Sequence, residues 1–243
     1  MDVSKSTSGL RDKTAQSVLI EDPGPNPLEE YFVTNNARLI HKWAHYFEIY
    51  HRHFHPFRGR QITLMEFGVY RGGSLQMWKH YFGEQARIVG VDIDPDCKKF
   101  EEPQIEIHIG DQANSDFLLQ LRQKIGPIDI LIDDGGHTMT QQITTFEEMF
   151  PTIRLGGIYL VEDLHTSYWS EYGGGLRQPG TFVEFVKGLV DHLHAWHFRD
   201  ETDRQRTYYM RHIKAMHLYD SVFVFDKGVV NPPSVHKTGG IPS

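Results

Sequence analysis

The sequence predicts an α/β fold in which a doubly wound, mostly parallel sheet carries helices on both faces. Short apolar runs rich in valine and isoleucine alternate with amphipathic stretches through most of the chain. Runs of that kind are typical of parallel strands buried on both faces, and the stretches between them are typical of crossover helices. The length of 243 residues suits one such domain with additions at its ends.

The individual elements follow from this alternation. Strands are expected at residues 62–67, 87–91, 105–109, 128–132 and 157–161. Helices are expected at residues 73–82, 95–100, 116–124, 140–149 and 180–194. Near the end, residues 211–218 and 221–225 are separated by Tyr219-Asp220, which predicts a hairpin added to the parallel sheet.

The segment before the first strand predicts an arm and a helical cap. Residues 1–27 are polar and end in three prolines and a glycine, so we expect a flexible arm. Residues 28–59 are expected to form the cap, because an apolar stripe recurs there at helical spacing: Leu39, Ile40, Trp43, Phe47 and Tyr50. Such a stripe needs a surface to cover, which predicts a lid or self-association into a homo-oligomer.

Residues 60–228 would then form the main domain, and residues 229–243 an irregular tail. The composition argues against several partners for this domain. A net charge of −7 without a lysine-rich block argues against nucleic acid. No apolar run approaches the roughly 18 residues of a membrane-spanning helix, and no secretory signal is evident. Cys97 is the single cysteine and cannot form an internal disulfide, which predicts a cytoplasmic protein.

The first strand runs directly into a turn that contains Gly68, Gly72 and Gly73. In an open α/β sheet, ligands bind beyond the carboxyl ends of the strands, and glycines let the backbone approach them. The spacing matches neither the dinucleotide fingerprint nor a phosphate loop. A plain strand–helix connection is the alternative interpretation of this turn.

Polar residues at the ends of the next two strands favour a ligand at this edge. Asp92 ends the second strand roughly 20 residues after the glycine turn, where a ribose diol would be hydrogen-bonded. Asp111 and Gln112 follow the third strand, where a purine edge would lie. The pattern therefore predicts a small ligand with a nucleoside part.

Acidic pairs follow the fourth and fifth strands, which are neighbours in such a sheet. Asp133-Asp134 precedes His137, and Glu162-Asp163 ends the fifth strand. Carboxylates this close repel one another unless a cation neutralises them, and oxygen ligands suit Mg²⁺ better than Zn²⁺. The alternative is that these acids cap helices or pair with Arg154. His137 is a candidate general base, with a structural role as the alternative.

Three sequence motifs together resemble a known family. The runs EFGVYRGGS, VGVDID and HIGDQ are similar to the cofactor motifs of S-adenosylmethionine-dependent methyltransferases, over about residues 60–228. This resemblance implies a Rossmann-like, seven-stranded sheet whose last strand is antiparallel. It also implies a set of cofactor contacts: Glu66, Gly68, Tyr70, Arg71, Gly72 and Ser74 in the turn, Asp92 at the ribose, Asp111 and Gln112 near the adenine, and Asp133 on the sulfonium side or behind the metal ligands.

The runs DDGGH and GGIYLVEDLHTSYW narrow the resemblance to the metal-dependent O-methyltransferases that modify sugars on macrolides and related natural products. This resemblance implies Asp134, Glu162 and Asp163 as Mg²⁺ ligands and His137 as the base. The partner would be a hydroxylated small molecule in natural-product or antibiotic biosynthesis. Three residues just beyond the acidic pair are candidates for its binding: His165, Tyr168 and Trp169.

Other functions remain open at this point. Cephalosporin-hydroxylase-type proteins share the style of the glycine turn, and a metal-independent methyltransferase could act on a phenol or catechol. A cofactor-binding scaffold without catalysis is a further alternative. His51, His53 and His55 look like a metal tract, but they end an amphipathic helix with no cysteine or carboxylate at ligand spacing, so we expect a structural role.

Overall fold

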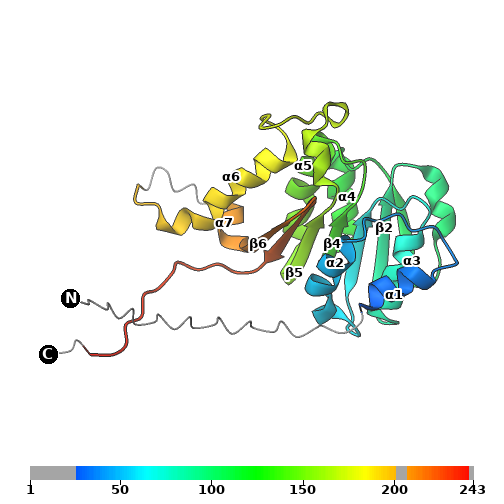
Figure 1. Ribbon diagram of the computed structural model, residues 1–243, viewed down its shortest axis with the longest axis horizontal. Helices are drawn as coiled ribbons and strands as arrows, with labels where there is room; N and C mark the ends of the chain where they lie inside the picture. Colours follow the sequence, from blue (N-terminus) through cyan, green and yellow to red (C-terminus); the bar gives the residue numbers. More distant parts are fainter. Residues whose placement is uncertain (1–25, 201–206, 241–243) are drawn as a thin grey trace, which may run out of the picture.

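The computed structural model describes residues 26–200 and 207–240. The expected arm at residues 1–27 therefore lies outside the described part, except for its last two residues. In this part of the chain seven strands form one sheet in the order β3-β2-β1-β4-β5-β7-β6 (Figure 1). Their bounds are β1 Thr63–Phe67, β2 Arg87–Asp92, β3 Ile105–Ile109, β4 Ile128–Asp133, β5 Ile153–Val161, β6 Ile213–Tyr219 and β7 Val222–Lys227.

The strand directions confirm the fold class expected from the sequence. Strands β1 to β5 pair in parallel, while β7 runs antiparallel to both β5 and β6. Because β1 lies beside β4 as well as β2, the strand order reverses at β1. That reversal opens a crevice at the carboxyl ends of the strands, where ligands bind in open α/β sheets.

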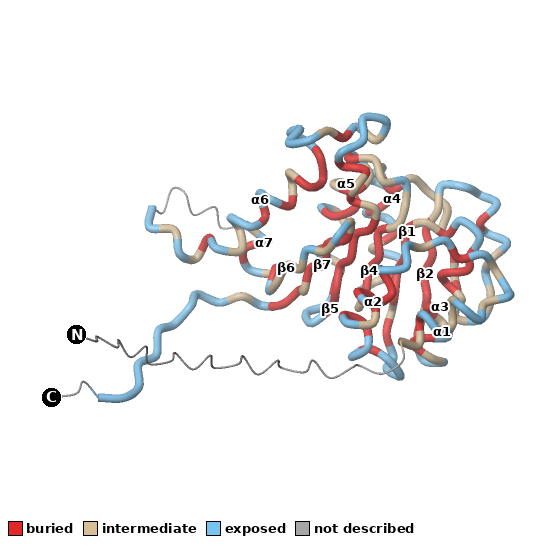
Figure 2. Tube along the Cα trace, in the orientation of Figure 1, coloured by how far each residue is buried: buried red, intermediate tan, exposed pale blue. Residues whose placement is uncertain are grey.

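Helices cover both faces of the sheet, as Figure 1 shows. Their bounds are α1 Pro27–Thr34, α2 Tyr46–Phe54, α3 Gly73–Phe82, α4 Ser115–Ile125, α5 Met139–Met149, α6 Phe182–His194 and α7 Tyr208–His212. One apolar core lies between the sheet and α1, α2 and α3, and a second lies between the sheet and α4, α5 and α6. The strands are the most continuously buried part of the trace in Figure 2.

The cap differs from the single helix expected over residues 28–59. Helices α1 and α2 are separated by a non-helical segment at residues 35–45, in which Leu39 and Trp43 are each 56% exposed. This segment passes so close to the start of α3 that a Cβ on Gly73 would lie 2.2 Å from the carbonyl oxygen of Leu39. The prediction of one apolar helical stripe was therefore wrong, because this segment is irregular, packs against α3 and buries the side chain of Lys42.

Smaller differences lie at element boundaries. Residues 95–100 form a 3₁₀ helix, β5 begins at Ile153, and α7 occupies residues that were partly assigned to the first strand of the hairpin. In α7 the side chain of Thr207 caps the backbone N–H of Met210, which favours a helical turn over an extended start. None of the described helices is long and apolar enough to cross a membrane.

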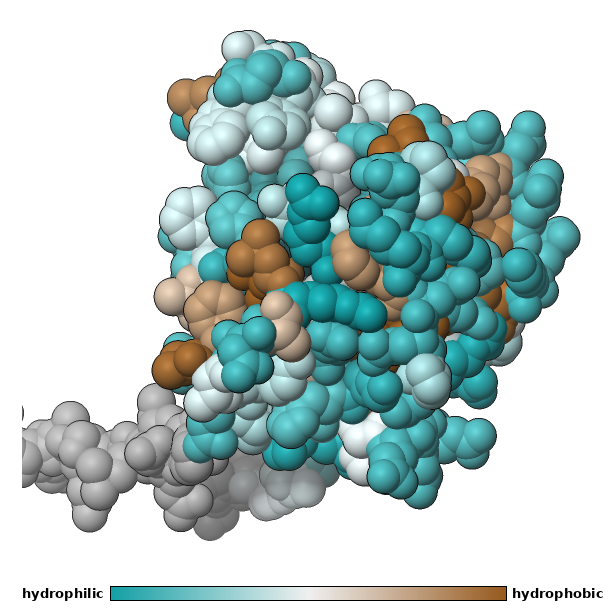
Figure 3. Space-filling view, turned by 90° about the vertical axis from the view of Figure 1, so that its right-hand side faces the viewer, coloured by the Kyte–Doolittle hydropathy of each residue, from teal (hydrophilic) through white to brown (hydrophobic). Residues whose placement is uncertain are grey.

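The surface in Figure 3 is mostly hydrophilic, and its hydrophobic residues gather in small patches. The face of the molecule in this view has no single broad apolar surface that would support the expected self-association. The oligomeric state therefore stays a prediction from the sequence.

A buried lysine in β7 generates a prediction about pH. The amine of Lys227 is 3% exposed and donates to the carbonyl oxygens of Phe150 and Pro151. Burial lowers the pKa of Lys227 to about 8. Since the unfolded chain keeps a lysine pKa of about 10.4, it binds more protons than the folded chain between these values. This residue therefore adds stability as the pH rises from about 8 to about 10.

We expect Lys227→Met to remove that gain. Urea denaturation at pH 7 and at pH 10 measures the free energy of unfolding of both proteins. The value for the wild type minus the value for the variant should be larger at pH 10 than at pH 7. Lys214→Met, at an exposed position on β6, is the control and should show no such shift. An unchanged difference between the two pH values would contradict the prediction.

Candidate active site

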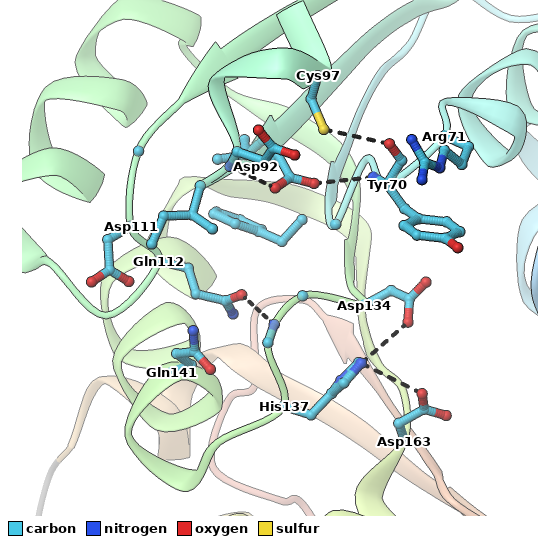
Figure 4. Close-up of a pocket in the computed structure, with 18 of the residues that line it drawn as sticks. Tyr70, Arg71, Asp92, Cys97, Asp111, Gln112, Asp134, His137, Gln141 and Asp163 are labelled. Carbon is cyan, nitrogen blue, oxygen red and sulfur yellow. Dashed lines mark hydrogen bonds and ion pairs between the residues drawn. The ribbon is translucent and has the colours of Figure 1, made fainter. Parts of the chain in front are cut away.

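A cavity of about 490 Å³ opens at the carboxyl ends of the central strands (Figure 4). Its size lies within the range of small-molecule sites. Most residues selected from the sequence line it: Gly68, Tyr70, Arg71, Asp92, Asp111, Gln112, Asp134, His137 and Asp163. Four other predicted residues do not line the cavity and lie behind its wall: Glu66, Gly72, Ser74 and Asp133. Glu162 faces a second cavity.

Asp92 ends β2 and fixes the backbone of the glycine turn. Its Oδ2 atom accepts hydrogen bonds from the N–H groups of Val69, at 2.8 Å, and Tyr70, at 3.0 Å. Burial alone would raise the pKa of Asp92, but the backbone donors, including that of Asp94, lower it below its ordinary value. The side chain is therefore an ionised acceptor that lies on the cavity wall.

Two glycines allow close contacts between the segments that form the cavity floor. A Cβ on Gly68, whose φ is +91°, would lie 2.0 Å from the carbonyl oxygen of Asp134. A Cβ on Gly135 would lie 1.7 Å from Oε1 of Gln112, which accepts a hydrogen bond from the N–H of Gly136. Gly68 has no room for a larger residue, because the contact is with backbone and its φ is positive, and a larger residue at Gly135 would displace the side chain of Gln112.

Asp133 lies behind the cavity wall rather than in it. Its carboxylate is fully buried and accepts a hydrogen bond of 2.9 Å from the amide of Gln112. Burial raises the pKa of Asp133 to about 7. In this structure Asp133 orients Gln112, and its second oxygen, Oδ2, has no hydrogen-bond partner.

The remaining turn residues also face inward. Glu66 is fully buried and accepts a hydrogen bond of 2.6 Å from the hydroxyl of Ser74. Gly72, in the left-handed region with a φ of +71°, leaves room for the ring of Phe100. These three residues shape the turn from behind the cavity wall.

The ammonium group of Lys42 lies among three carboxylates. Its Nζ atom is 3.3 Å from Glu66, 2.5 Å from Asp134 and 3.0 Å from Glu162, and the side chain is 2% exposed. Burial alone would lower the pKa of Lys42, but the three carboxylates raise it well above its ordinary value. One buried cation thus joins the ends of β1, β4 and β5.

Glu162 is held by this inner cluster. The hydroxyl of Tyr50 donates to it at 2.6 Å, and Lys42 donates to both of its oxygens. Burial and the nearby Asp134 raise the pKa of Glu162 well above its ordinary value. The carboxylate borders a second cavity of about 260 Å³, beside Lys42 and Trp43.

His137 meets two carboxylates on the outer side of the cluster. Its Nε2 atom is 3.8 Å from Oδ1 of Asp134 and 3.5 Å from Oδ2 of Asp163. Dashed lines mark both contacts in Figure 4. Its backbone has a φ of +58°, a strained conformation for a residue with a side chain. Potential ligand atoms of these three residues all lie within 4.8 Å of one another, which is a suitable spacing for one metal ion.

Asp163 is oriented by a neighbour that the sequence did not suggest. The hydroxyl of Tyr46 on α2 donates to Oδ1 of Asp163 at 2.7 Å and leaves Oδ2 toward His137. The two oxygens of Asp134 also have different partners, because Oδ2 faces Lys42 and Oδ1 faces His137. Each of these carboxylates therefore keeps one oxygen on the outer side.

The alternative roles considered for the acids are taken by other residues. Helix α5 begins with a capping box between Thr138 and Gln141, so Asp134 does not cap it. Arg154 lies 3.5 Å from Asp129, which precedes the acidic pairs on β4. Asp134 and Asp163 are thus free of these structural partners.

The three candidate acceptor residues lie beside the second cavity or on the surface. The Nδ1 atom of His165 is 2.6 Å from the hydroxyl of Ser221, and its ring contacts Trp43 and Trp169 edge-on. Tyr168 and Trp169 are 50% and 45% exposed. Only His165 lines the cavity that Glu162 borders.

Lys42, Tyr46 and Tyr50 contact the acidic residues but were not predicted as site residues from the sequence. The one available signal was a lysine between Ile40 and Trp43 in an otherwise apolar pattern. Such a lysine is more often solvated, so the pattern alone gave no reason to place it against the strand ends.

The chain is similar to known methyltransferases. Residues 65–164 match a family model described as a methyltransferase domain. The chain is 37% identical over 231 residues to demethylmacrocin O-methyltransferase of Streptomyces fradiae, covering 90% of this chain and 55% of that protein. It is 35% identical to mycinamicin VI 2''-O-methyltransferase of Micromonospora griseorubida, covering 91% of this chain and 55% of that protein.

The solved structures include a similar protein with its ligands. The MycE methyltransferase of the mycinamycin biosynthetic pathway, in complex with Mg and SAH, superposes with a TM-score of 0.75 at 33% identity. The match covers 84% of this chain and 55% of that one. The chain thus spans about half the length of the proteins it matches.

The inner cluster generates a prediction about stability. Lys42→Met leaves the buried carboxylates of Glu66 and Glu162 and the partly exposed one of Asp134 without their cation. Removing one partner of a buried ion pair costs about 3–5 kcal/mol. We expect a loss of that size in the free energy of unfolding, measured by urea denaturation with EDTA present. Adding Glu162→Gln should restore part of it, since one of the unpaired charges is then removed.

The matched control is Lys187→Met, which removes an exposed ion pair with Glu184. A surface pair contributes about 0–1 kcal/mol, so this variant should stay close to wild type. Equal effects of the two single variants would show that Lys42 does not hold the strand ends together.

Proposed function

The chain belongs to the class I S-adenosylmethionine-dependent methyltransferases, with relatives among the macrolide sugar O-methyltransferases, and we propose that it methylates a hydroxyl of a glycosylated small molecule with the help of Mg²⁺. One observation carries this proposal: a cavity whose lining residues suit a bound nucleoside ends at a cluster of Asp134, His137 and Asp163. A methyl donor and a metal-bound acceptor would meet at that junction.

The first cavity fits S-adenosylmethionine. Asp92 offers a half-buried, ionised acceptor for a ribose diol, and Asp111 and Gln112 border the part of the cavity beyond it. The close backbone packing at Gly68 leaves no side chain in the space where β1 meets the cavity. The bound cofactor would supply an electrophilic methyl group on a sulfonium, while these residues bind and align it.

The outer cluster fits a divalent cation. Asp134 and Asp163 each present one oxygen there, and their negative charge is not neutralised on that side within the described residues. Carboxylate oxygens with room for water suit Mg²⁺, which would lower the pKa of a coordinated sugar hydroxyl. Glu162, the third proposed ligand, already serves Lys42 and Tyr50, so its share in metal binding would require a change in those contacts.

His137 is proposed as the general base. Its Nε2 atom faces the two outer carboxylates, whereas its Nδ1 atom is buried and has no hydrogen-bond partner. Nε2 is thus the nitrogen that can take a proton from an acceptor held between Asp134 and Asp163. The carboxylates would then stabilise the positive charge on the ring.

The acceptor side is proposed from the second cavity. Trp43 and His165 border it, and Trp169 packs against His165, so aromatic surfaces would lie beside a bound sugar. The relatives are named as O-methyltransferases of demethylmacrocin, of a rhamnosyl tetracenomycin-C and of mycinamicin VI. A cytoplasmic location and a homo-oligomer are further expectations of the same proposal.

The proposed base generates a kinetic prediction. His137→Ala should lower kcat by about 100- to 10,000-fold, the usual contribution of general acid–base catalysis. Affinity for S-adenosylmethionine, measured by calorimetric titration, should be unchanged because His137 lies at the far end of the cavity from Asp92. Full turnover in the variant would exclude His137 as the base, and a loss of Mg²⁺ affinity would identify it as a ligand instead.

The proposed metal site generates a binding prediction. Asp134→Asn should weaken Mg²⁺ or Mn²⁺ binding by about tenfold or more, measured by titration with the metal alone. Asp116→Asn, at an exposed position in α4, is the control and should bind normally. If wild type binds the cofactor but no divalent metal, the metal-independent or scaffold alternatives replace this proposal. If it binds no S-adenosylmethionine, the proposed function is wrong.

A further inference from the structure

A second set of metal-type donors lies outside the site described above. His53 on α2, His217 on β6 and Asp226 on β7 offer ligand atoms that all lie within 4.8 Å of one another. We propose that these three residues bind a first-row transition metal ion such as Zn²⁺, which ties the helical cap to the C-terminal hairpin. This proposal does not depend on the proposed methyl transfer.

The sheet register explains why the two hairpin residues meet. Asp226 pairs with Ala215 across β6 and β7, and His217 lies two residues further along β6. Side chains two residues apart in a strand point to the same face, so His217 and Asp226 are diagonal neighbours. The Nε2 atom of His217 lies 3.1 Å from Oδ2 of Asp226.

Helix α2 packs on that face and brings the third donor. The ring centroids of His53 and His217 are 4.7 Å apart, with their planes at 63°. The Nε2 atom of His53 lies 2.9 Å from the hydroxyl of Tyr219, which is two residues beyond His217 on the same face. Tyr219 thus holds the ring of His53 in place, as a partner behind a metal ligand does.

The set is separate from the candidate active site. Asp226 pairs with Ile158 in the middle of β5, whereas the acidic pair follows Val161 at the carboxyl end of that strand. His53 and Asp226 line a groove with residues 155–158 of β5, and none of the active-site residues borders it. An ion at this position would therefore act on the packing of α2 and not on the cofactor.

The donor chemistry favours zinc over magnesium. Two imidazoles and one carboxylate are a common ligand set for Zn²⁺ with one position left for water, whereas Mg²⁺ prefers oxygen ligands alone. His53 is 8% exposed, and its ring lies between the hydroxyl of Tyr219 and the ring of His217. His217 and Asp226 are 36% and 35% exposed in their side chains, which gives an ion access from solvent.

The neighbouring cations are mostly engaged elsewhere. Arg52 lies 3.2 Å from Glu48, and Lys227 donates to the carbonyl oxygens of Phe150 and Pro151. Lys214 also lines the groove and is exposed to solvent. Asp226 contributes the one negative charge of the set, so a bound Zn²⁺ would leave a net positive site.

Titration of the untagged, metal-stripped chain with ZnCl₂ tests this proposal, in saturating Mg²⁺ so that the outer active-site cluster is occupied. We expect one Zn²⁺ site that raises the melting temperature. His217→Ala and, separately, Asp226→Asn should each weaken this site by about tenfold or more. The Mg²⁺ affinity of both variants should stay at the wild-type value.

The matched control is His55→Ala, which removes an exposed histidine from the 3₁₀ turn that follows α2. It should keep full zinc affinity, as should Asp134→Asn. Circular dichroism establishes that each variant is folded, and the two hairpin variants change different strands, so one misfolded protein does not decide the test. Zinc binding that is absent in wild type, or equally strong in both hairpin variants, would overturn the proposal and leave an ordinary His217–Asp226 ion pair.

Discussion

The ion pairs of Lys42 are the interaction on which the rest of the site depends. Glu66, Asp134 and Glu162 end three different strands, and their carboxylates would repel one another in a buried space. The ammonium group of Lys42 neutralises part of that charge from the segment between α1 and α2. The cap is therefore part of the site, because the strand ends could not remain this close and dry without it.

This arrangement also separates two sides of the acidic cluster. Lys42, Tyr50 and Glu162 form the inner side, while Asp134, His137 and Asp163 form the outer side next to the cavity. Asp134 belongs to both, with one oxygen on each side. The fixed cation binds Oδ2 of Asp134 and thus leaves the other oxygen, Oδ1, on the side of His137.

The residues that the sequence identified therefore have unequal positions. Asp92 and Gln112 line the cavity, while Asp133 supports Gln112 and Glu66 supports Lys42 from behind. Motif spacing could not show which residues line the cavity and which lie behind its wall. Consecutive residues of a strand point to opposite faces, so the neighbours Asp133 and Asp134 have different surroundings. His53 was expected to be structural, because no carboxylate lies near it in the sequence. In the fold the carboxylate of Asp226, 173 positions later along the chain, lies near it.

The sequence alone determined the parallel sheet, its hairpin and the meeting of acids at one edge. These depend on local periodicity and on the rule that parallel strands end on the same side, both of which are written in short stretches of chain. The tertiary structure decided that residues 35–45 are not helical, that the side chain of Lys42 is buried, and that Glu162 faces inward. Those outcomes come from contacts between segments far apart in sequence, where burial and charge pairing outweigh the local helical pattern.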